Sequence, residues 1–196
     1  MTVVDRLLEL PLVYSLWQAP FARQKFKPVE RQLADVSVRR VLDVGCGPGT
    51  NAGRFSGADY VGIDINEDYL VEARRNHPGR FIRADLATSD LSALGTFDVI
   101  LVNSFLHHLP DREVHALLAR VYERLAPGGH IHILELVRPP NWSLGRLMAR
   151  LDRGKYARPI EQWQSMFSGH FAPRVVEPYF FGGRLWSMVY FQGARR

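Results

Sequence analysis

The chain has 196 residues, enough for one domain with a sizeable hydrophobic core. Its composition, 46% hydrophobic and 23% charged, is typical of a soluble globular protein. A single cysteine, Cys46, excludes an internal disulfide framework and fits a reducing setting. No stretch approaches the roughly 20 apolar residues of a membrane span, and the first 17 residues lack the pattern of a signal peptide. We therefore expect a soluble, cytoplasmic protein.

The chain is basic, with a formal net charge of +5 and a pI of about 9.7. Such a balance would suit nucleic acid, an anionic membrane surface or an acidic small substrate as a partner. A solvated basic surface is the simpler explanation of the total. The positions of the charges are therefore more informative than their sum.

The first predicted element, Leu12–Arg31, mixes aromatic and basic residues and is expected to form a helix or lid. Short β-type runs and helical stretches then alternate along the chain. The predicted strands are Val41–Val44, Tyr60–Ile63, Phe81–Arg83, Phe97–Val102 and His130–Leu136, and the helices between them are Glu67–Asn76 and Glu113–Leu125. This alternation predicts an α/β fold around a mostly parallel sheet whose strands are covered on both faces.

The pattern changes after Pro139-Pro140. A basic segment, Arg138–Arg158, comes first, followed by a helix near Ile160–Phe167. Two further strands, Arg174–Phe181 and Leu185–Phe191, are joined by Gly182-Gly183. These strands predict a hairpin that ends the sheet with an antiparallel last strand. With no internal repeat or linker, we expect a single domain whose parts are residues 1–38 (helical lid), 39–137 (core), 138–158 (basic insertion) and 159–196 (helix and hairpin).

The run Val41-Leu42-Asp43-Val44-Gly45-Cys46-Gly47-Pro48-Gly49-Thr50 reads as a buried strand that enters a glycine-rich turn before a helix. Glycines there allow positive φ and let a ligand approach the backbone, and amides at the helix start point into the same space. The spacing is Gly-x-Gly-x-Gly and not the dinucleotide pattern Gly-x-Gly-x-x-Gly. An acid at Asp43 would repel a diphosphate but suits a ligand that carries an ammonium group and a sulfonium.

Further polar residues follow the next three strands. Asp64 lies about 20 residues after the glycine turn, where a carboxylate accepts both hydroxyls of a ribose. As the N-cap of the next helix, Asn66 or Asp68 fits better than Asp64. Asp85 ends the third strand and is suited to an adenine amine. The fourth strand ends in Asn103 and leads into Ser104-Phe105-Leu106-His107-His108-Leu109-Pro110-Asp111.

This ordered set of motifs resembles the class I S-adenosylmethionine-dependent methyltransferases, especially the small-molecule subgroup with a His-His-Leu-Pro-Asp segment after strand four. The resemblance covers about half of the chain and implies a Rossmann-like, seven-stranded sheet in the order 3-2-1-4-5-7-6 with strand seven antiparallel. It implies S-adenosylmethionine as cofactor, with S-adenosylhomocysteine as product. The implied cofactor contacts are Asp43, Gly45 and Gly47 (methionine part), Asp64 (ribose), Asp85 and Leu86 (adenine), and Asn103 and Ser104 (sulfonium side), with Ile65 as a further cofactor contact.

Methyl transfer from a sulfonium is an in-line displacement, so placement of the reactants is the main task of the enzyme. A general base is needed only if the acceptor must lose a proton. His107 and His108 are the candidate bases, because they follow strand four at the active face and histidine titrates near neutral pH. Packing against the cofactor or a helix is the alternative role for one of them. No residue cluster has convincing metal-ligand spacing.

Two segments outside the shared core are candidates for acceptor binding. Tyr14 and Trp17 lie in the N-terminal segment, and Arg150 and Tyr156 lie in the basic insertion, which carries six positive charges against the single acid Asp152. This insertion could meet a carboxylate, phosphate or nucleotide. A solvated amphipathic helix explains the same pattern equally well. The mixture of aromatic and basic residues also suits a lipid-like acceptor at a membrane surface.

We therefore expect methyl transfer to a small-molecule acceptor, which is anionic or lipid-like, and we expect an oxygen atom of the acceptor to receive the methyl group. An RNA or protein methyltransferase is one alternative. Against it, Asn103-Ser104-Phe105-Leu106 replaces the Asn-Pro-Pro-aromatic run of enzymes that methylate planar amines, and nucleic acid is not an expected partner. A non-catalytic module that binds the cofactor is the second alternative. A nicotinamide-dependent oxidoreductase is the third, and Asp43 and the glycine spacing speak against it.

Overall fold

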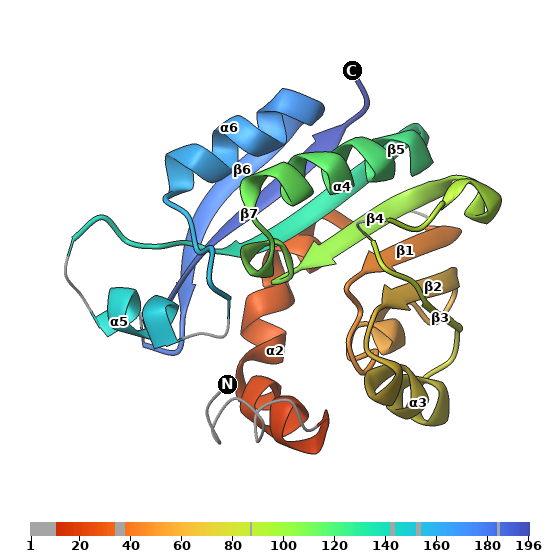
Figure 1. Ribbon diagram of the computed structural model, residues 1–196, viewed down its shortest axis with the longest axis horizontal. Coiled ribbons are helices and arrows are strands. Elements are labelled where there is room, and N and C mark those ends of the chain that lie inside the picture. Colours follow the sequence, from red (N-terminus) through yellow and green to blue (C-terminus); the bar gives the residue numbers. More distant parts are fainter. Residues whose placement is uncertain (1–10, 34–37, 87, 142–143, 152–153, 184) are drawn as a thin grey trace.

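The computed structural model describes residues 11–33, 38–86, 88–141, 144–151, 154–183 and 185–196, and the side chains of residues 11–21, 144, 148, 150 and 151 lie outside that description. One seven-stranded sheet has the order β3-β2-β1-β4-β5-β7-β6 (Figure 1). Strands β1 to β5 pair in parallel, and β7 is antiparallel to both neighbours. The expected order and direction are confirmed. The strands are β1 (Arg40–Val44), β2 (Asp59–Asp64), β3 (Arg80–Arg83), β4 (Phe97–Asn103), β5 (Leu125–Leu136), β6 (Ala172–Phe181) and β7 (Trp186–Ala194).

Helices cover both faces of the sheet (Figure 1). One face carries α4 (Asp111–Arg124) and α6 (Ile160–His170), and the other carries α2 (Pro11–Leu33), α3 (Glu67–Asn76) and α5 (Leu144–Leu151). In α4, Val114, Leu117, Leu118 and Val121 recur at helical spacing and are buried. The predicted helix pattern therefore marks the buried side of α4.

The central strands are apolar on both faces because each face is covered by helices. Side chains alternate along each strand, so Leu42 and Val44 join the core under α4 and α6, while Val41 joins the core under α2 and α3. The same alternation directs Asp43 toward the side of α2 and α3. Asp64 and Asn103 end β2 and β4 on that side as well, since Ile63 and Val102 belong to the opposite core. Three polar side chains therefore project to one side of the sheet at its carboxyl edge.

The terminal hairpin forms as expected from Gly182-Gly183. Both glycines have positive φ, 60° and 66°, which residues with a side chain rarely adopt. The turn brings Phe181 opposite Trp186, and pairing continues to Ala172 opposite Ala194. Strand β7 thereby lies between β5 and β6, and β6 is the edge strand at this end of the sheet.

Two local expectations differ from the structure. The glycine turn after β1 leads into a single 3₁₀ turn, η1 (Ala52–Phe55), and not into an α-helix. Only a few residues separate this turn from β2, and Gly53 and Gly57 weaken any helix there. Strand β5 begins at Leu125 and not at His130, with a register shift opposite Phe97 and Val99 that absorbs the Pro-Gly-Gly turn.

The basic insertion leaves and re-enters the fold at one place. Val137 forms an isolated parallel bridge with Arg158, and the Arg138 N–H donates to the Arg158 carbonyl at 2.8 Å. Helix α5 lies between these two ends, and its Ala149 is buried in the core that also contains Phe181. Among the described helices, none combines the length and apolar character that crossing a membrane would require.

Candidate functional site

The glycine turn after β1 forms an elbow at the carboxyl edge of the sheet. Gly45 and Gly47 have φ values of 70° and 55°. A Cβ on Gly45 would lie 2.6 Å from the Phe105 ring, so only glycine fits there. A Cβ on Gly47 would meet no atom within 4 Å, so its backbone faces open space. The elbow therefore leaves room for a ligand against Gly47.

Asp43 lies beneath this elbow and is fully buried. Its Oδ2 accepts hydrogen bonds from the Tyr60 hydroxyl at 2.5 Å and from Asn51 Nδ2 at 3.0 Å. Its Oδ1 is buried without a partner. Burial raises the pKa of Asp43 to about 6, although the bonds from Tyr60 and Asn51 act in the opposite direction. The carboxyl group is therefore largely ionised at neutral pH, with one oxygen unsatisfied.

Asp64 ends β2 beside the elbow. Its Oδ2 accepts the Gly47 N–H and its Oδ1 accepts the Asn66 N–H, both at 2.9 Å. Each carboxylate oxygen has a second lone pair, so Asp64 retains acceptor capacity for a ligand. Asn66 is the N-cap of α3, as its side chain accepts from Asp68 and Tyr69. The next residue after Asp64, Ile65, is an apolar side chain with 59% exposure.

The end of β3 contributes Asp85 and Leu86. The half-buried Asp85 begins a turn in which its Oδ2 accepts from Thr88 Oγ1 at 3.0 Å. Leu86 is buried in the core under α4. Asp85 therefore stands at the edge of the sheet while Leu86 packs inward.

The end of β4 contributes Asn103 and Ser104. Asn103 Nδ2 donates to Asn51 Oδ1 at 3.4 Å, and Asn103 Oδ1 is buried without a partner. Ser104 has a positive φ of 53°, unusual for a residue with a side chain, and its N–H donates to the Leu134 carbonyl. The chain therefore turns sharply here, directly beside Asn103.

A buried carboxylate on β5 fixes the loop that follows. Glu135 Oε1 accepts the N–H groups of Phe105 and Leu106 at 2.8 and 2.6 Å, and its Oε2 contacts His107 Nδ1 at 2.7 Å. Burial alone would raise the pKa of Glu135, but His107 and the N–H groups of Leu106 and Phe105 lower it below its usual range. His107 itself is 3% exposed, whereas His108 is exposed.

The returning end of the basic insertion packs on this loop. The Tyr156 N–H donates to the His107 carbonyl at 3.0 Å, and Gly154 lies so close to the His107 ring that a Cβ would be 1.9 Å from Cδ2. Arg158 donates to the Leu109 carbonyl at 2.7 Å and to Asp111 Oδ1 at 2.6 Å. The Tyr156 side chain remains 40% exposed. Tyr14, Trp17 and Arg150 have side chains outside the described part of the structure.

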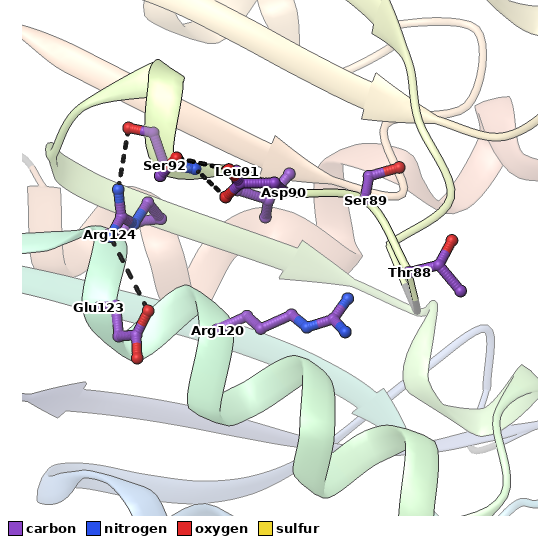
Figure 2. A pocket seen from close by; sticks show the side chains of 8 residues that line it. All are labelled: Thr88, Ser89, Asp90, Leu91, Ser92, Arg120, Glu123 and Arg124. Atoms are coloured by element: carbon purple, nitrogen blue, oxygen red, sulfur yellow. Dashed lines mark hydrogen bonds and ion pairs between the residues drawn. The ribbon is translucent and has the colours of Figure 1, made fainter.

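A polar depression of about 310 Å³ lies between the loop after β3 and the second half of α4 (Figure 2), and none of its lining residues belongs to the elbow. Its arginines are already engaged, since Arg120 donates to the Leu86 carbonyl and Arg124 to the Ser92 carbonyl.

Within the described residues no cluster of three metal-ligating side chains occurs. Cys46 is buried, and burial raises the pKa of its thiol well above its usual value, which suits a packing role.

Three residues of this site were not predicted from the sequence: Asn51, Tyr60 and Glu135. Glu135 carried a signal, because a charged residue stood within the apolar run of a predicted buried strand. Asn51 and Tyr60 carried none, since their contacts with Asp43 and Asn103 depend on how the strands and the glycine turn are arranged in space.

The sequence comparisons place a known domain on this part of the fold. Residues 41–129 match the family model described as a methyltransferase domain. Over 130 residues the chain is 35% identical to the trans-aconitate 2-methyltransferase of Delftia acidovorans. The matched stretch covers 62% of this chain and 47% of that protein. The chain spans about half the length of the curated relatives it matches.

Solved structures share the fold at low identity. The N-methyltransferase NodS from Bradyrhizobium japonicum, in complex with S-adenosylhomocysteine, superposes with a TM-score of 0.72 at 14% identity and covers 89% of this chain and 86% of that one. Human N-acetylserotonin methyltransferase, in complex with S-adenosylmethionine, gives 0.71 at 17% identity over 95% of this chain and 55% of that one. The class I methyltransferase fold of this chain is confirmed.

Proposed function

We propose that this chain, which carries a class I methyltransferase domain, transfers the methyl group of S-adenosylmethionine to a small-molecule acceptor. The observation that carries the proposal is the fully buried Asp43, which has an unsatisfied oxygen beneath a glycine elbow that faces open space. Buried acceptors in native proteins almost always have a donor. A ligand that supplies this donor is therefore the natural complement of the site.

The residues at the carboxyl edge fit each part of the cofactor. Asp43 Oδ1 and Asn103 Oδ1 are acceptors, which suits an ammonium group. Asp64 keeps lone pairs for ribose hydroxyls, and the exposed Ile65 offers an apolar surface for a planar ring. When bound, this cofactor supplies a methyl group activated by a positively charged sulfur. NodS and human N-acetylserotonin methyltransferase, on the same fold, were solved with this cofactor or its product.

The protein's contribution is mainly positional. The glycine elbow removes side chains from the ligand path, and Glu135 fixes the loop from Phe105 to His107 through two N–H groups and the imidazole. Such fixed placement favours in-line attack, because the entropy of aligning the reactants is lost before the chemical step. We assign His107 to positioning of this loop, because Gly154 covers its ring. His108, which is exposed, is the residue of the pair that is placed to meet an acceptor.

We propose an anionic acceptor that reacts through oxygen. One relative acts on trans-aconitate, a small tricarboxylate whose nucleophilic heteroatoms are carboxylate oxygens. A carboxylate is already ionised at neutral pH and needs no general base. In the basic insertion, Arg138, Lys155 and the Tyr156 ring are exposed and available for such an acceptor. Tyr14, Trp17 and Arg150 remain proposed acceptor contacts.

Two measurements test the proposal in sequence. Calorimetry of the purified chain with S-adenosylhomocysteine should give one binding site per chain. Transfer of labelled methyl groups should then be followed with a panel of small carboxylates including trans-aconitate, together with phenols, sugars and RNA. Turnover with carboxylates alone supports the full proposal. Binding without turnover on any acceptor would indicate a non-catalytic module, and absence of binding by folded protein would refute the cofactor assignment.

A further inference from the structure

We propose that Asn51 is a positioning residue that orients Asp43 and Asn103 together, so that both present an acceptor oxygen to the amine of the bound ligand's amino acid tail. The inference rests on the proposed function. Asn51 lies at the start of η1, joins the ends of β1 and β4, and is 8% exposed.

The side chain of Asn51 does not cap the turn that follows it, although capping is the usual role of an asparagine at the start of a helical turn. It stands at the N-cap of η1, yet it makes no capping hydrogen bond. N-cap asparagines usually accept from backbone N–H groups in the following turn. Here the amide contacts Asp43 and Asn103 instead. Its role is therefore to connect these two side chains and not to stabilise the turn.

The charge on Asp43 decides which way this amide faces. A carboxylate can only accept, so Asn51 must present its Nδ2 to Asp43 Oδ2, at 3.0 Å. The opposite orientation would place the amide oxygen against the carboxylate oxygen, which is repulsive. Asn51 Oδ1 is thereby directed toward Asn103.

The orientation of Asn51 in turn decides that of Asn103. Because Asn51 presents its oxygen, Asn103 must present its Nδ2, at 3.4 Å. Asn103 Oδ1 then remains as an acceptor, and it is buried without a partner, like Asp43 Oδ1. A single ionised group thus fixes two amides in series. Both unsatisfied atoms are acceptors, so the ligand group that fits them must carry several N–H donors.

An ammonium group meets this requirement, since it has three N–H donors and a positive charge that complements Asp43. Neither a hydroxyl group, with its single donor, nor a carboxylate, with none, fits an acceptor pair beside an ionised acid. The amine of the amino acid tail is therefore the ligand group that the hydrogen-bonded series Asp43–Asn51–Asn103, here called the relay, selects.

The test uses S-adenosylhomocysteine and its desamino analogue, which keeps the nucleoside, the sulfur and the carboxylate but lacks the amine. Asn51→Ala should weaken S-adenosylhomocysteine roughly 10- to 100-fold in Kd by calorimetry, the range of a charge-assisted hydrogen bond. The Kd of the desamino analogue should change less than about twofold, because the group that Asn51 serves is absent. Asn76→Ala, at the exposed end of α3, is the matched control and should change neither value.

Each outcome bears on the inference separately from the proposed function. Equal losses for both ligands, or no loss for either, would overturn the role of Asn51. Equal affinity of the unmodified chain for both ligands would overturn the amine assignment, whereas failure of the unmodified chain to bind either would refute the proposed function. If Asn51→Ala does not fold, Asn103→Ala removes one acceptor at the partly exposed edge of the site. It should show the same selective loss, and an unselective loss would overturn the relay.

Discussion

Replacing Asp43 with asparagine should separate the stability of the unliganded protein from its affinity for the cofactor. The pKa of Asp43 is raised from 3.8 to about 6 in the folded chain, mainly because the carboxyl group is fully buried. At about 1.4 kcal/mol per pH unit, this difference corresponds to about 3 kcal/mol. The folded state therefore holds the proton more tightly than the unfolded state. The associated stability is fully present below pH 3.8 and is lost as the pH rises through 6.

In Asp43→Asn the nearly isosteric side chain has no proton to lose. Between roughly pH 4 and pH 6, the free energy of unfolding of the unliganded, unmodified chain should fall by about 3 kcal/mol. Denaturant unfolding of the unliganded variant should not show this fall. Calorimetry with S-adenosylhomocysteine should show the opposite effect on binding. At pH 7.5 we expect a Kd that is roughly 10- to 100-fold weaker, because an ammonium loses its ionised partner.

The pH dependence of binding provides the sharpest readout. In the unmodified chain, Kd should weaken by about tenfold for each pH unit below 6 until it approaches the Kd of Asp43→Asn, because the cation needs the ionised carboxyl group. The Kd of Asp43→Asn should be nearly independent of pH in this range. Asp68→Asn, an exposed change in the first turn of α3, is the control and should keep the slope. An unchanged affinity at pH 7.5, or a slope that persists in Asp43→Asn, would refute the reasoning.

Three further predictions concern the loop after β4. Glu135→Gln should lower the free energy of unfolding by about 2–4 kcal/mol at pH 7, because an amide cannot accept all the hydrogen bonds that the carboxylate accepts. The difference in unfolding free energy between the two proteins should shrink as the pH falls through the lowered pKa of Glu135. A pH-independent deficit in denaturant titrations would contradict this account. Gly154→Ala should destabilise the fold by about 1–3 kcal/mol through its clash with the His107 ring, whereas Gly169→Ala, in open space on α6, should raise Tm slightly. With a carboxylate acceptor, His108→Ala should change kcat less than about threefold, and a loss of 100-fold or more would instead assign general-base catalysis to His108.

The elements with strong local patterns could be predicted from the sequence. The apolar run Tyr60–Ile63 became the central strand β2, and the helix Glu67–Asn76 has the predicted bounds. Gly182-Gly183 marked the terminal hairpin because positive φ at both positions requires glycine or a similarly tolerant residue. Local chemistry determined these features, so a window of ten residues contained the necessary information.

Features that depend on distant partners could not be predicted in this way. Asn51 contacts Asn103 across 52 positions, and Glu135 reaches back 28 positions to His107. The sequence between the glycine turn and β2 suggested an ordinary helix, but its few residues and glycines allow only a 3₁₀ turn. The acids at the strand ends were predicted because parallel strands bring their carboxyl ends to one edge. The side chains that orient those acids were missed.

The adjoining ends of the basic insertion have a consequence for how this protein can change. Val137 and Arg158 are neighbours across a parallel bridge, so the two ends of the basic insertion lie side by side, while Ala149 within it is buried in the core and Gly154 packs on the His107 ring. Changing the length of a segment with adjoining ends changes the entropic cost of loop closure little, since each doubling of a flexible loop costs only about 0.6 kcal/mol. A different stretch between these two points that keeps the buried contacts of Ala149 and Gly154 should therefore change the proposed acceptor contacts while the sheet stays intact. The bridge therefore marks the two ends of the segment to exchange when testing whether the insertion sets the proposed choice of acceptor.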